Sequence, residues 1–377
     1  IFMKKVLIFY ASYGGGHLSA AKSIQKYLEE HYSAEVKSEI IDCMKYINTT
    51  LDVVTTGAYR EMAKKAPNLW GKVYSNSQSG VLGHVSSRAN KIMAIKLKKL
   101  ICEKNPDLII STHPFSSQMV SYLKKKGKVN CKLATILTDF ASHEQWLVGH
   151  EYTNFFFVSN DNMEKELCDY GVAKDKIHVT GIPMSDRFFE KFDRTSILRM
   201  FNLMPDKKVI LFFGGGEFGL GKERTVQILR SLILNAHDYQ IVAISGKNEK
   251  MKEAFESLVK ELNVSSKVKI LGFTDKVPEL MSISDLVVTK PGGLTTTESL
   301  VSHLPIIIIN PIPGQEEENA EFLEKHKVGI WIKKDDDPDA ILLNLFDNQD
   351  KIENMRENTK SLAKTHSTKN ICEILMK

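Results

Sequence analysis

No apolar run of this 377-residue chain approaches the ~20 residues that a membrane-spanning helix requires. Cysteine is scarce and odd in number, five residues without a C-x-x-C pair, so neither a zinc site nor a disulfide framework is indicated. The chain has no low-complexity tract and no short-period repeat. Its first residues lead directly into a strand-like run without a signal-peptide pattern. We therefore expect a globular protein of a reducing, cytoplasmic compartment.

Positive charge is concentrated in one part of the sequence. The net charge is +5, yet residues 41–130 alone carry fifteen Lys and Arg against five Asp and Glu. Residues 44–103 contain no confident strand and mix apolar and aromatic side chains with these cations, ending in a basic amphipathic pattern, Lys91–Ile101. Taken alone, that last helix is more typical of one packed on a sheet. The whole segment favours contact with an anionic membrane surface, and we expect no nucleic-acid partner.

Strand and helix patterns alternate through the rest of the chain, which predicts parallel sheets with crossover helices. Two runs, Lys5–Tyr10 and Lys208–Phe213, are each followed by a glycine triplet and a helical pattern. We predict an α/β protein of two doubly wound, Rossmann-like domains, joined between Pro183 and Pro205. Further strands are expected at Asp107–Thr112, Leu133–Thr138, Asn154–Val158, Ile177–Thr180, Gln240–Ser245, Lys267–Leu271, Asp285–Thr289, Pro305–Asn310 and Gly329–Ile332. Because such sheets bind ligands at the carboxyl ends of their strands, we expect an interdomain cleft.

The stretch Lys290–Glu298 carries the clearest chemical signal. It follows a strand-like run and opens a helical one, with Gly292 and Gly293 at the junction and Thr295 just inside. Glycines let the backbone approach a ligand, and a helix N-terminus is a natural seat for phosphate. Glu298, one turn further on, could hold sugar or ribose hydroxyls. The pattern indicates a nucleotide-diphosphate site, although an ordinary glycine-rich strand-to-helix turn of an α/β protein would have a similar sequence.

Other loops of the second half suit the same ligand. Backbone N–H groups at Gly214 and Gly215, together with Ser245 and Lys247, could face phosphate oxygens, although no Walker loop is present. Phe273 could stack on a flat base.

Two further polar stretches open helices near the end of the chain. Gln315, Glu316 and Asn319 could bind sugar hydroxyls, or simply complement a helix dipole. Asp335–Asp337 contains a D-x-D pattern, but helix capping accounts for it, so we assign no metal.

The first half supplies candidates for proton transfer. His17 starts a helix after a strand and three glycines, and imidazole titrates near neutral pH. Asp139 ends another strand, where it could orient His17 or accept a proton itself. His143 and Trp146 are candidate acceptor-side residues. The alternatives are a solvated helix-start histidine, a helix cap at Asp139 and a core position for Trp146.

Together these segments resemble the family 28 glycosyltransferases of the two-domain GT-B fold, in the branch of processive diacylglycerol glucosyltransferases and monogalactosyldiacylglycerol synthases. The resemblance covers nearly the whole chain. It rests on Tyr13–His17, Thr138–Trp146, Gly181–Pro183, Gly246–Asn248, Lys290–Glu298 and Pro313–Asn319.

The resemblance implies inverting, metal-independent transfer of a hexose from a UDP-sugar to diacylglycerol, with no other cofactor; glucose is favoured and galactose is left open. The implied catalytic residues are His17 and Asp139. The implied acceptor-side residues are Gly15, Gly16, His143 and Trp146. The implied donor contacts are Gly214, Gly215, Ser245 and Lys247 in the loops, Phe273 and Val277 at the uracil, Gly292, Gly293 and Thr295 at the diphosphate, Glu298 at the ribose, and Gln315, Glu316 and Asn319 at the sugar.

The implied organisation is an acceptor and membrane-facing domain at 1–183, a UDP-sugar domain at 184–365, and a helix at 366–377 that returns to the first domain. The protein would lie peripherally on the inner face of the cell membrane. Two alternatives remain: a UDP-sugar epimerase of the same architecture, which would not need the basic segment, and a non-catalytic nucleotide-sugar sensor.

Overall fold

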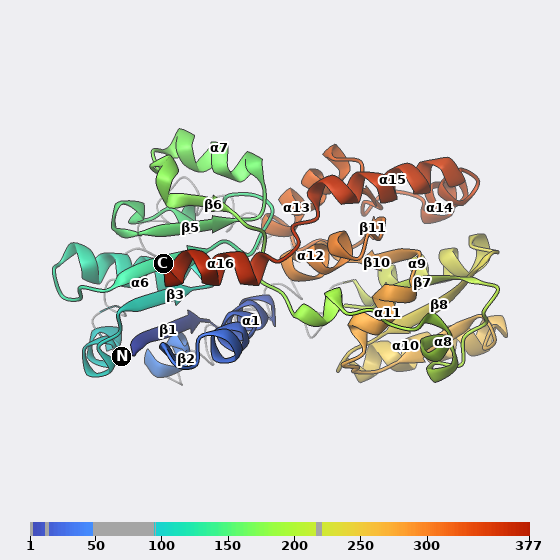
Figure 1. The fold of residues 1–377 in the computed structure, drawn as a ribbon. Coiled ribbons are helices and arrows are strands. Elements are labelled where there is room, and N and C mark those ends of the chain that lie inside the picture. The colour runs from blue at the N-terminus through green and yellow to red at the C-terminus, as the bar shows by residue number, and fades with distance from the viewer. Residues whose placement is uncertain (1–2, 12–14, 48–93, 95, 216–220) are drawn as a thin grey trace. The chain divides into compact units, whose positions relative to one another are not determined.

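The computed structural model describes residues 3–11, 15–47, 94, 96–215 and 221–377. The chain divides into two compact units, which are described separately (Figure 1). The first contains residues 1–185, 313–315 and 364–377, and the second contains residues 186–312 and 316–363.

The first unit is built on a six-stranded parallel sheet in the order β2-β1-β3-β4-β5-β6. Its strands are β1 (Lys4–Tyr10), β2 (Val36–Asp42), β3 (Leu108–Ser111), β4 (Lys132–Ile136), β5 (Phe155–Val158) and β6 (Ile177–Val179). Its helices include α1 (Gly15–His31), α2 (Cys43–Ile47), α6 (Pro114–Lys125), α7 (Asp161–Tyr170) and α16 (Ser367–Met376).

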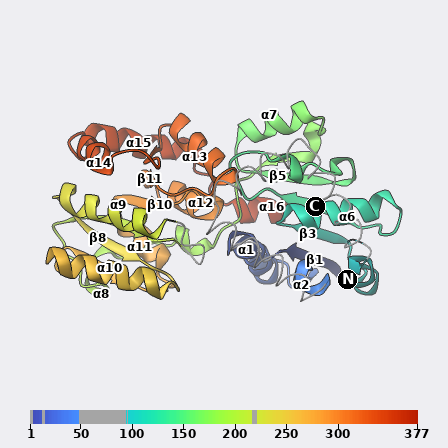
Figure 2. The same ribbon diagram turned by 180° about the vertical axis from the view of Figure 1, so that it is seen from behind.

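Helices cover both faces of this sheet. Successive residues of a strand point to opposite faces, so each strand contributes apolar side chains to both sides. Leu7 and Phe9 pack in a cluster with α6 and with the helix that contains residues 96–104, whereas Val6 and Ile8 pack with α1 and α16. Figure 1 shows α16, the red end of the chain, among the blue and green elements of this unit. The view from behind in Figure 2 brings α6 and α2 to the viewer's side. The last helix of the chain is thus part of the first core.

The second unit has a six-stranded parallel sheet in the order β12-β11-β10-β7-β8-β9. Its strands are β7 (Lys208–Phe213), β8 (Tyr239–Ile244), β9 (Val268–Leu271), β10 (Leu286–Thr289), β11 (Ile306–Ile308) and β12 (Gly329–Trp331). Its helices are α8 (Arg194–Met200), α9 (Lys222–Asn235), α10 (Glu249–Leu262), α11 (Val277–Ile283), α12 (Gly293–Val301), α13 (Gln315–Lys325), α14 (Pro338–Phe346) and α15 (Gln349–Leu362), with α13 beginning in the segment grouped with the first unit.

The same local device fixes strand register in both units. Asp107 precedes β3 and its Oδ2 accepts a hydrogen bond from the Lys5 N–H of β1 at 2.8 Å. Asp285 precedes β10 and its Oδ2 accepts one from the Val209 N–H of β7, also at 2.8 Å. Each aspartate supplies an acceptor to the first N–H groups of the neighbouring strand, which the ladder leaves unpaired.

Strand order places one switch point in each sheet, where loops leave toward opposite faces and ligands bind in doubly wound folds. In the first unit it lies between β1 and β3, so the β1–α1 and β3–α6 loops meet there. In the second unit it lies between β7 and β10, where the loop after Phe213 and the Lys290–Gly292 loop begin. Both switch points carry predicted site residues.

Two parallel sheets with covering helices confirm the predicted α/β, doubly wound class. Every strand that we predicted is present, within one or two residues at most ends. The sequence analysis missed β2, an edge strand whose Lys37 and Glu39 are exposed and which has no continuous apolar run.

The segment predicted to contact a membrane falls mostly on residues 48–93, outside the described part of the chain. Of its last helix, Ala94, Leu97, Leu100 and Ile101 are buried in the core, as expected for a helix packed on a sheet. Among the described residues, no helix has the length and apolar character needed to span a membrane.

Candidate functional site

His17 lies in the first turn of α1, at the switch point of the first sheet. Its Nδ1 is 2.6 Å from the Thr112 carbonyl oxygen and 3.1 Å from the Thr138 hydroxyl. A carbonyl oxygen only accepts hydrogen bonds, so Nδ1 carries the proton of the neutral ring and Nε2 keeps its lone pair. The imidazole is therefore held in the tautomer in which Nε2 is the basic atom.

Burial keeps this imidazole neutral. It lowers the pKa of His17 from 6.5 to about 4, against the smaller opposite effect of the Thr112 hydrogen bond. Neighbouring His113, whose ring centroid is 4.6 Å away, has its pKa lowered well below 6.5 by burial first and by His17 second. A neutral ring with a free lone pair can accept a proton.

Asp139 follows β4 and is almost fully buried. Its Oδ2 accepts a short hydrogen bond from Nε2 of Gln315, a residue grouped with the first unit. Among the described residues no hydrogen bond joins Asp139 to His17, which is held by Thr112 instead. The structure thus brings together a predicted catalytic residue and a predicted sugar contact, while the assisting role of Asp139 stays a prediction.

The predicted acceptor-side residues occupy different environments. Gly15 and Gly16 form the start of α1, and a Cβ at Gly15 would meet no described atom within 4 Å. His143 caps the short helix Glu144–Trp146, accepting from the Gln145 N–H, and burial lowers its pKa to about 4. Trp146 is buried in a cluster with Leu137 and Phe156, the core position that was the alternative. A contact between these residues and an acceptor stays a prediction.

In the second unit, the N-terminus of α12 is open. The helix begins at Gly293, its N-cap Gly292 offers no side-chain hydrogen bond, and the first described helical bond runs from the Thr296 N–H to the Gly292 carbonyl at 2.9 Å. The N–H groups of Gly293, Leu294 and Thr295 therefore have no acceptor within the helix. Together with the helix dipole they form a seat suited to an anion.

Glu298 lies one turn inside the same helix. Burial alone raises the pKa of its carboxyl from 4.5 to about 8. Its carboxyl makes no hydrogen bond or ion pair with the described residues, in contrast to the nearby buried acid Glu316. A poorly solvated carboxyl without a partner is poised to gain from ligand hydroxyls.

Two more loops of this sheet hold predicted donor residues. Gly214 follows β7 directly, and a Cβ there would come within 2.7 Å of the Phe255 ring; Gly215 has φ +92°, so both positions require glycine. Ser245 is buried and donates to the Leu271 carbonyl.

An exposed aromatic ring lies beside one of these loops. Nζ of Lys247 lies 5.3 Å from the ring centroid of Phe273, which is 71 % exposed. Val277 begins α11 four residues later and is partly exposed. The aromatic ring and the cation are available to a ligand.

Glu316 and Asn319 bind the protein itself. One carboxylate oxygen of Glu316 pairs with Lys290 Nζ at 2.5 Å, and the other accepts from the Ile312 N–H at 2.8 Å. The Asn319 amide donates to the Pro291 carbonyl at 3.0 Å. These contacts hold the loop that leads into α12, so any sugar contact of theirs stays a prediction.

The acidic triplet Asp335–Asp337 acts locally. Asp336 accepts from the Lys333 N–H at 2.8 Å, and Asp337 caps α14 through the Asp339 N–H at 3.1 Å. Within the described ranges, no three His, Cys, Asp or Glu residues are arranged to hold a metal ion.

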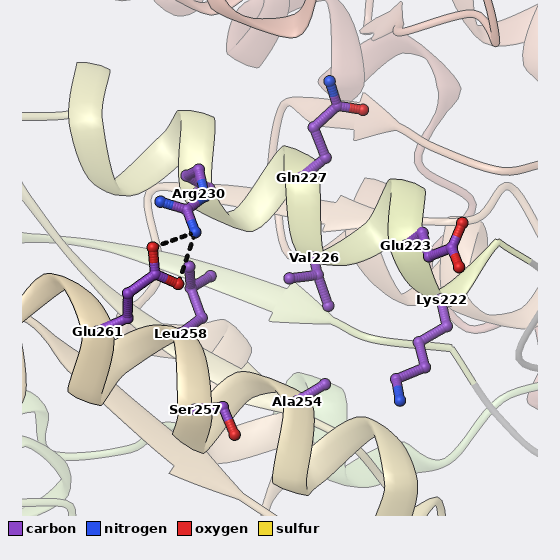
Figure 3. A pocket seen from close by; sticks show the side chains of 9 residues that line it. All are labelled: Lys222, Glu223, Val226, Gln227, Arg230, Ala254, Ser257, Leu258 and Glu261. Carbon is purple, nitrogen blue, oxygen red and sulfur yellow. Dashed lines mark hydrogen bonds and ion pairs between the residues drawn. The ribbon is translucent and has the colours of Figure 1, made fainter.

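A groove of about 480 Å³ lies between α9 and α10, away from every predicted site residue (Figure 3). Arg230 crosses one end and binds both carboxylate oxygens of Glu261 at 2.8 Å. Lys222 and Glu223 line the other end. With its cations offset by carboxylates, the groove is poorly suited to a diphosphate.

Sequence reasoning missed three residues that the structure places at these sites. Thr112 and His113 hold His17, and Lys290 pairs with Glu316. Thr112 and His113 could be found only by knowing that β3 pairs with β1, although β2 lies between these two strands in the sequence. Lys290 was visible in its motif but carried no role.

Two family models match this chain, one in each half of the sequence. Residues 17–184 match the family model described as monogalactosyldiacylglycerol (MGDG) synthase, and residues 209–373 match the glycosyltransferase family 28 C-terminal domain. A protein of Bacillus pumilus named processive diacylglycerol beta-glucosyltransferase is 30% identical, over 98% of this chain and 94% of its own length. The protein of that name from Bacillus subtilis is 29% identical, over 99% and 95%.

Solved structures share the fold at low identity. MurG of Acinetobacter baumannii aligns with a TM-score of 0.64 at 13% identity, over 99% of both chains. A UDP-GlcNAc 2-epimerase from Neisseria meningitidis aligns with a TM-score of 0.62 at 13% identity, over 99% of this chain and 100% of that one. These likenesses confirm the GT-B architecture and do not separate a transferase from an epimerase.

Sequence similarity to the curated relatives makes that separation, because it extends over nearly the full length of both proteins. With both halves matched by their family models, the chain belongs to the family 28 glycosyltransferases, in the branch of processive diacylglycerol glucosyltransferases and monogalactosyldiacylglycerol synthases.

Proposed function

We propose that this protein transfers a hexose, with glucose favoured over galactose, from a UDP-sugar to diacylglycerol with inversion at the anomeric carbon. Relatives that match the whole chain carry the name processive diacylglycerol beta-glucosyltransferase, which supports both the acceptor and the sugar. Solved structures of the same fold include complexes with UDP.

The donor half of the proposal depends on one observation: an open helix N-terminus lies close to a carboxyl that has no partner in the part of the chain that the structure describes. The free N–H groups of Gly293, Leu294 and Thr295 would bind the diphosphate. Glu298, one turn away, would accept hydrogen bonds from the ribose hydroxyls, which would compensate the cost of its burial. Phe273 would stack on the uracil ring, and Lys247 would lie near the phosphates.

His17 is the proposed base. Its Nε2 would take the proton of the diacylglycerol hydroxyl as the oxygen attacks the anomeric carbon from the side opposite UDP. Inversion follows from this single displacement, because no protein nucleophile takes part. Asp139 would assist His17, or would itself accept the proton of the diacylglycerol hydroxyl in its place.

Departure of UDP leaves negative charge on the diphosphate. The dipole and N–H groups of α12 are fixed before the reaction, so they would stabilise this charge without reorganising. We therefore propose that the reaction needs no metal ion and no other cofactor.

Diacylglycerol resides in membranes, so the enzyme would act at a membrane surface, peripherally and on its inner face. The basic segment 44–103 is the proposed contact. Co-sedimentation with vesicles of increasing anionic lipid content tests this, and binding that ignores lipid charge and salt would contradict it.

One assay tests the reaction. The protein is incubated with UDP-glucose or UDP-galactose, with and without diacylglycerol vesicles and EDTA, and products are analysed by mass spectrometry and by NMR of the anomeric proton. Release of UDP only with lipid, unaffected by EDTA and giving a β-glycoside, is expected.

Other outcomes point elsewhere. A changed sugar without lipid would indicate the epimerase, whose fold is shared, and binding without conversion would indicate a sensor. Loss of activity in EDTA would refute metal independence.

A further inference from the structure

A three-residue segment at the switch point of the first sheet holds His17 on several sides. The segment Ser111–His113 consists of the last residue of β3 and the two residues that join it to α6. The Thr112 carbonyl accepts from His17 Nδ1 at 2.6 Å, and the Thr112 hydroxyl donates to the His17 backbone carbonyl at 2.9 Å. One residue thus fixes both the ring and the main chain of His17.

The next residue, His113, adds a ring contact. Its imidazole meets that of His17 edge to face, with ring centroids 4.6 Å apart and planes at 70°, and it meets the ring of Phe115 at 4.9 Å. His113 Nδ1 accepts from the Phe115 N–H at 3.2 Å, so its proton lies on Nε2 and the ring is neutral. His113 is 5 % exposed, so it shields one side of His17 from water.

Hydroxyls hold the segment in this conformation. Ser111 Oγ and Ser116 Oγ lie 2.8 and 2.9 Å from the His113 carbonyl oxygen and are within hydrogen-bond distance of each other. Since each hydroxyl has one proton, one hydroxyl donates to the carbonyl while the other donates to the carbonyl or to its partner hydroxyl. The Thr112 N–H bonds to the Phe9 carbonyl of β1 at 3.0 Å. The position of Thr112 and His113 is therefore set by both β1 and the start of α6.

We propose that His113 is a positioning residue, whose ring packs against His17 so that Nδ1 stays on the Thr112 carbonyl and Nε2 faces the acceptor hydroxyl. The inference rests on the proposed role of His17 as base. Without the ring, the His17 side chain could rotate about Cβ–Cγ, and water could reach it.

Two variants of His113 separate this role from capping. His113→Asn keeps a side-chain acceptor for the Phe115 N–H but removes the ring, since Asn is a good N-cap. His113→Phe keeps a ring beside His17 but removes the acceptor. If His113 positions His17, Asn lowers kcat about 10- to 100-fold at unchanged KM for the UDP-sugar, while Phe stays within a few-fold of wild type.

The matched control is His178→Asn. His178 is a half-buried imidazole on β6 of the first sheet, stacked on Phe157 at 5.4 Å, and it has no predicted site role. Its replacement should leave kcat unchanged. Thermal unfolding and UDP binding establish that each variant is folded.

The pH profile gives a second readout. Removing the ring exposes His17 to water, so in His113→Asn the acid limb of kcat should move from near pH 4 toward 6.5. Nitrogen NMR of wild-type His17 should show a protonated Nδ1.

Three results overturn the proposal: the reverse order of the two variants, wild-type behaviour of both, or a His17 protonated at Nε2. Failure of the underlying function looks different. If His17→Ala turns over normally, His17 is not the base, whatever the His113 variants do.

Discussion

Replacement of Glu298 by Gln should abolish a pH dependence of stability that the wild-type protein carries. Burial raises the folded-state pKa of this carboxyl from 4.5 to about 8. Below pH 4.5 the group is protonated in both the folded and the unfolded chain. Between pH 4.5 and 8 only the unfolded chain releases the proton, so the wild type loses stability as pH rises through this window and levels off above 8.

The size of the effect follows from the shift. At about 1.4 kcal/mol per pH unit, the full shift corresponds to at most about 5 kcal/mol. Local rearrangement and water entry on ionisation reduce this, and we expect about 2–3 kcal/mol. At ~2–4 °C per kcal/mol for a domain of this size, the melting temperature of Glu298→Gln should rise relative to wild type by about 5–10 °C between pH 5 and pH 8.

Thermal unfolding of the two proteins at pH 5, 6, 7 and 8, without ligand, measures this difference. Glu256→Gln is the control, since Glu256 is exposed on α10 and its replacement should give a curve parallel to wild type. Parallel curves for Glu298→Gln and wild type would refute the reasoning, because they would mean that Glu298 is ionised and solvated in the folded protein.

Four further outcomes are expected. Glu298→Gln should weaken UDP binding about tenfold or more in calorimetry at pH 9, where the wild-type carboxyl is ionised and the amide is a poorer acceptor for ribose hydroxyls; unchanged affinity would remove Glu298 from the donor site. His17→Ala should keep UDP binding and lose about 100- to 10,000-fold in turnover. Wild-type kcat should hold down to about pH 5, since the pKa of His17 is about 4, and a limb centred at 6.5 would contradict a buried base. Lys290→Met should lower the melting temperature by leaving Glu316 buried without its 2.5 Å partner, and Lys290→Met with Glu316→Gln should recover part of the loss.

Fold class was predictable because both sheets consist of buried strands with continuous apolar runs, such as Lys208–Phe213, separated by helices of amphipathic pattern. The edge strand β2 was not, because its exposed Lys37 and Glu39 interrupt the apolar pattern. An edge strand has only one hydrogen-bonded neighbour and is partly exposed to solvent, so its sequence contains polar as well as apolar residues.

Local sequence predicted the strand-to-helix turn at Pro291, Gly292 and Gly293, because such residues mark a turn wherever the strand lies in its sheet; the role of this turn in donor binding stays a prediction. It could not show that Glu316 and Asn319 hold this loop, because both residue types serve protein and sugar equally well. Nor could it find Thr112 and His113, whose proximity to His17 depends on β1 and β3 being neighbours. Contacts between strands that are distant in the sequence cannot be predicted from the residue types of either segment alone.

The position of α16 bears on how the protein is synthesised. Ile371, Cys372 and Leu375 fill the core of the first unit beside α1, yet they are translated after the whole of the second unit. Until α16 has been translated, the first unit lacks these side chains, and the apolar residues of β1 and α1 that pack against them are uncovered. The first unit therefore completes its core only after the second unit has been synthesised, so a stop codon within the sequence of the second unit would destabilise both units.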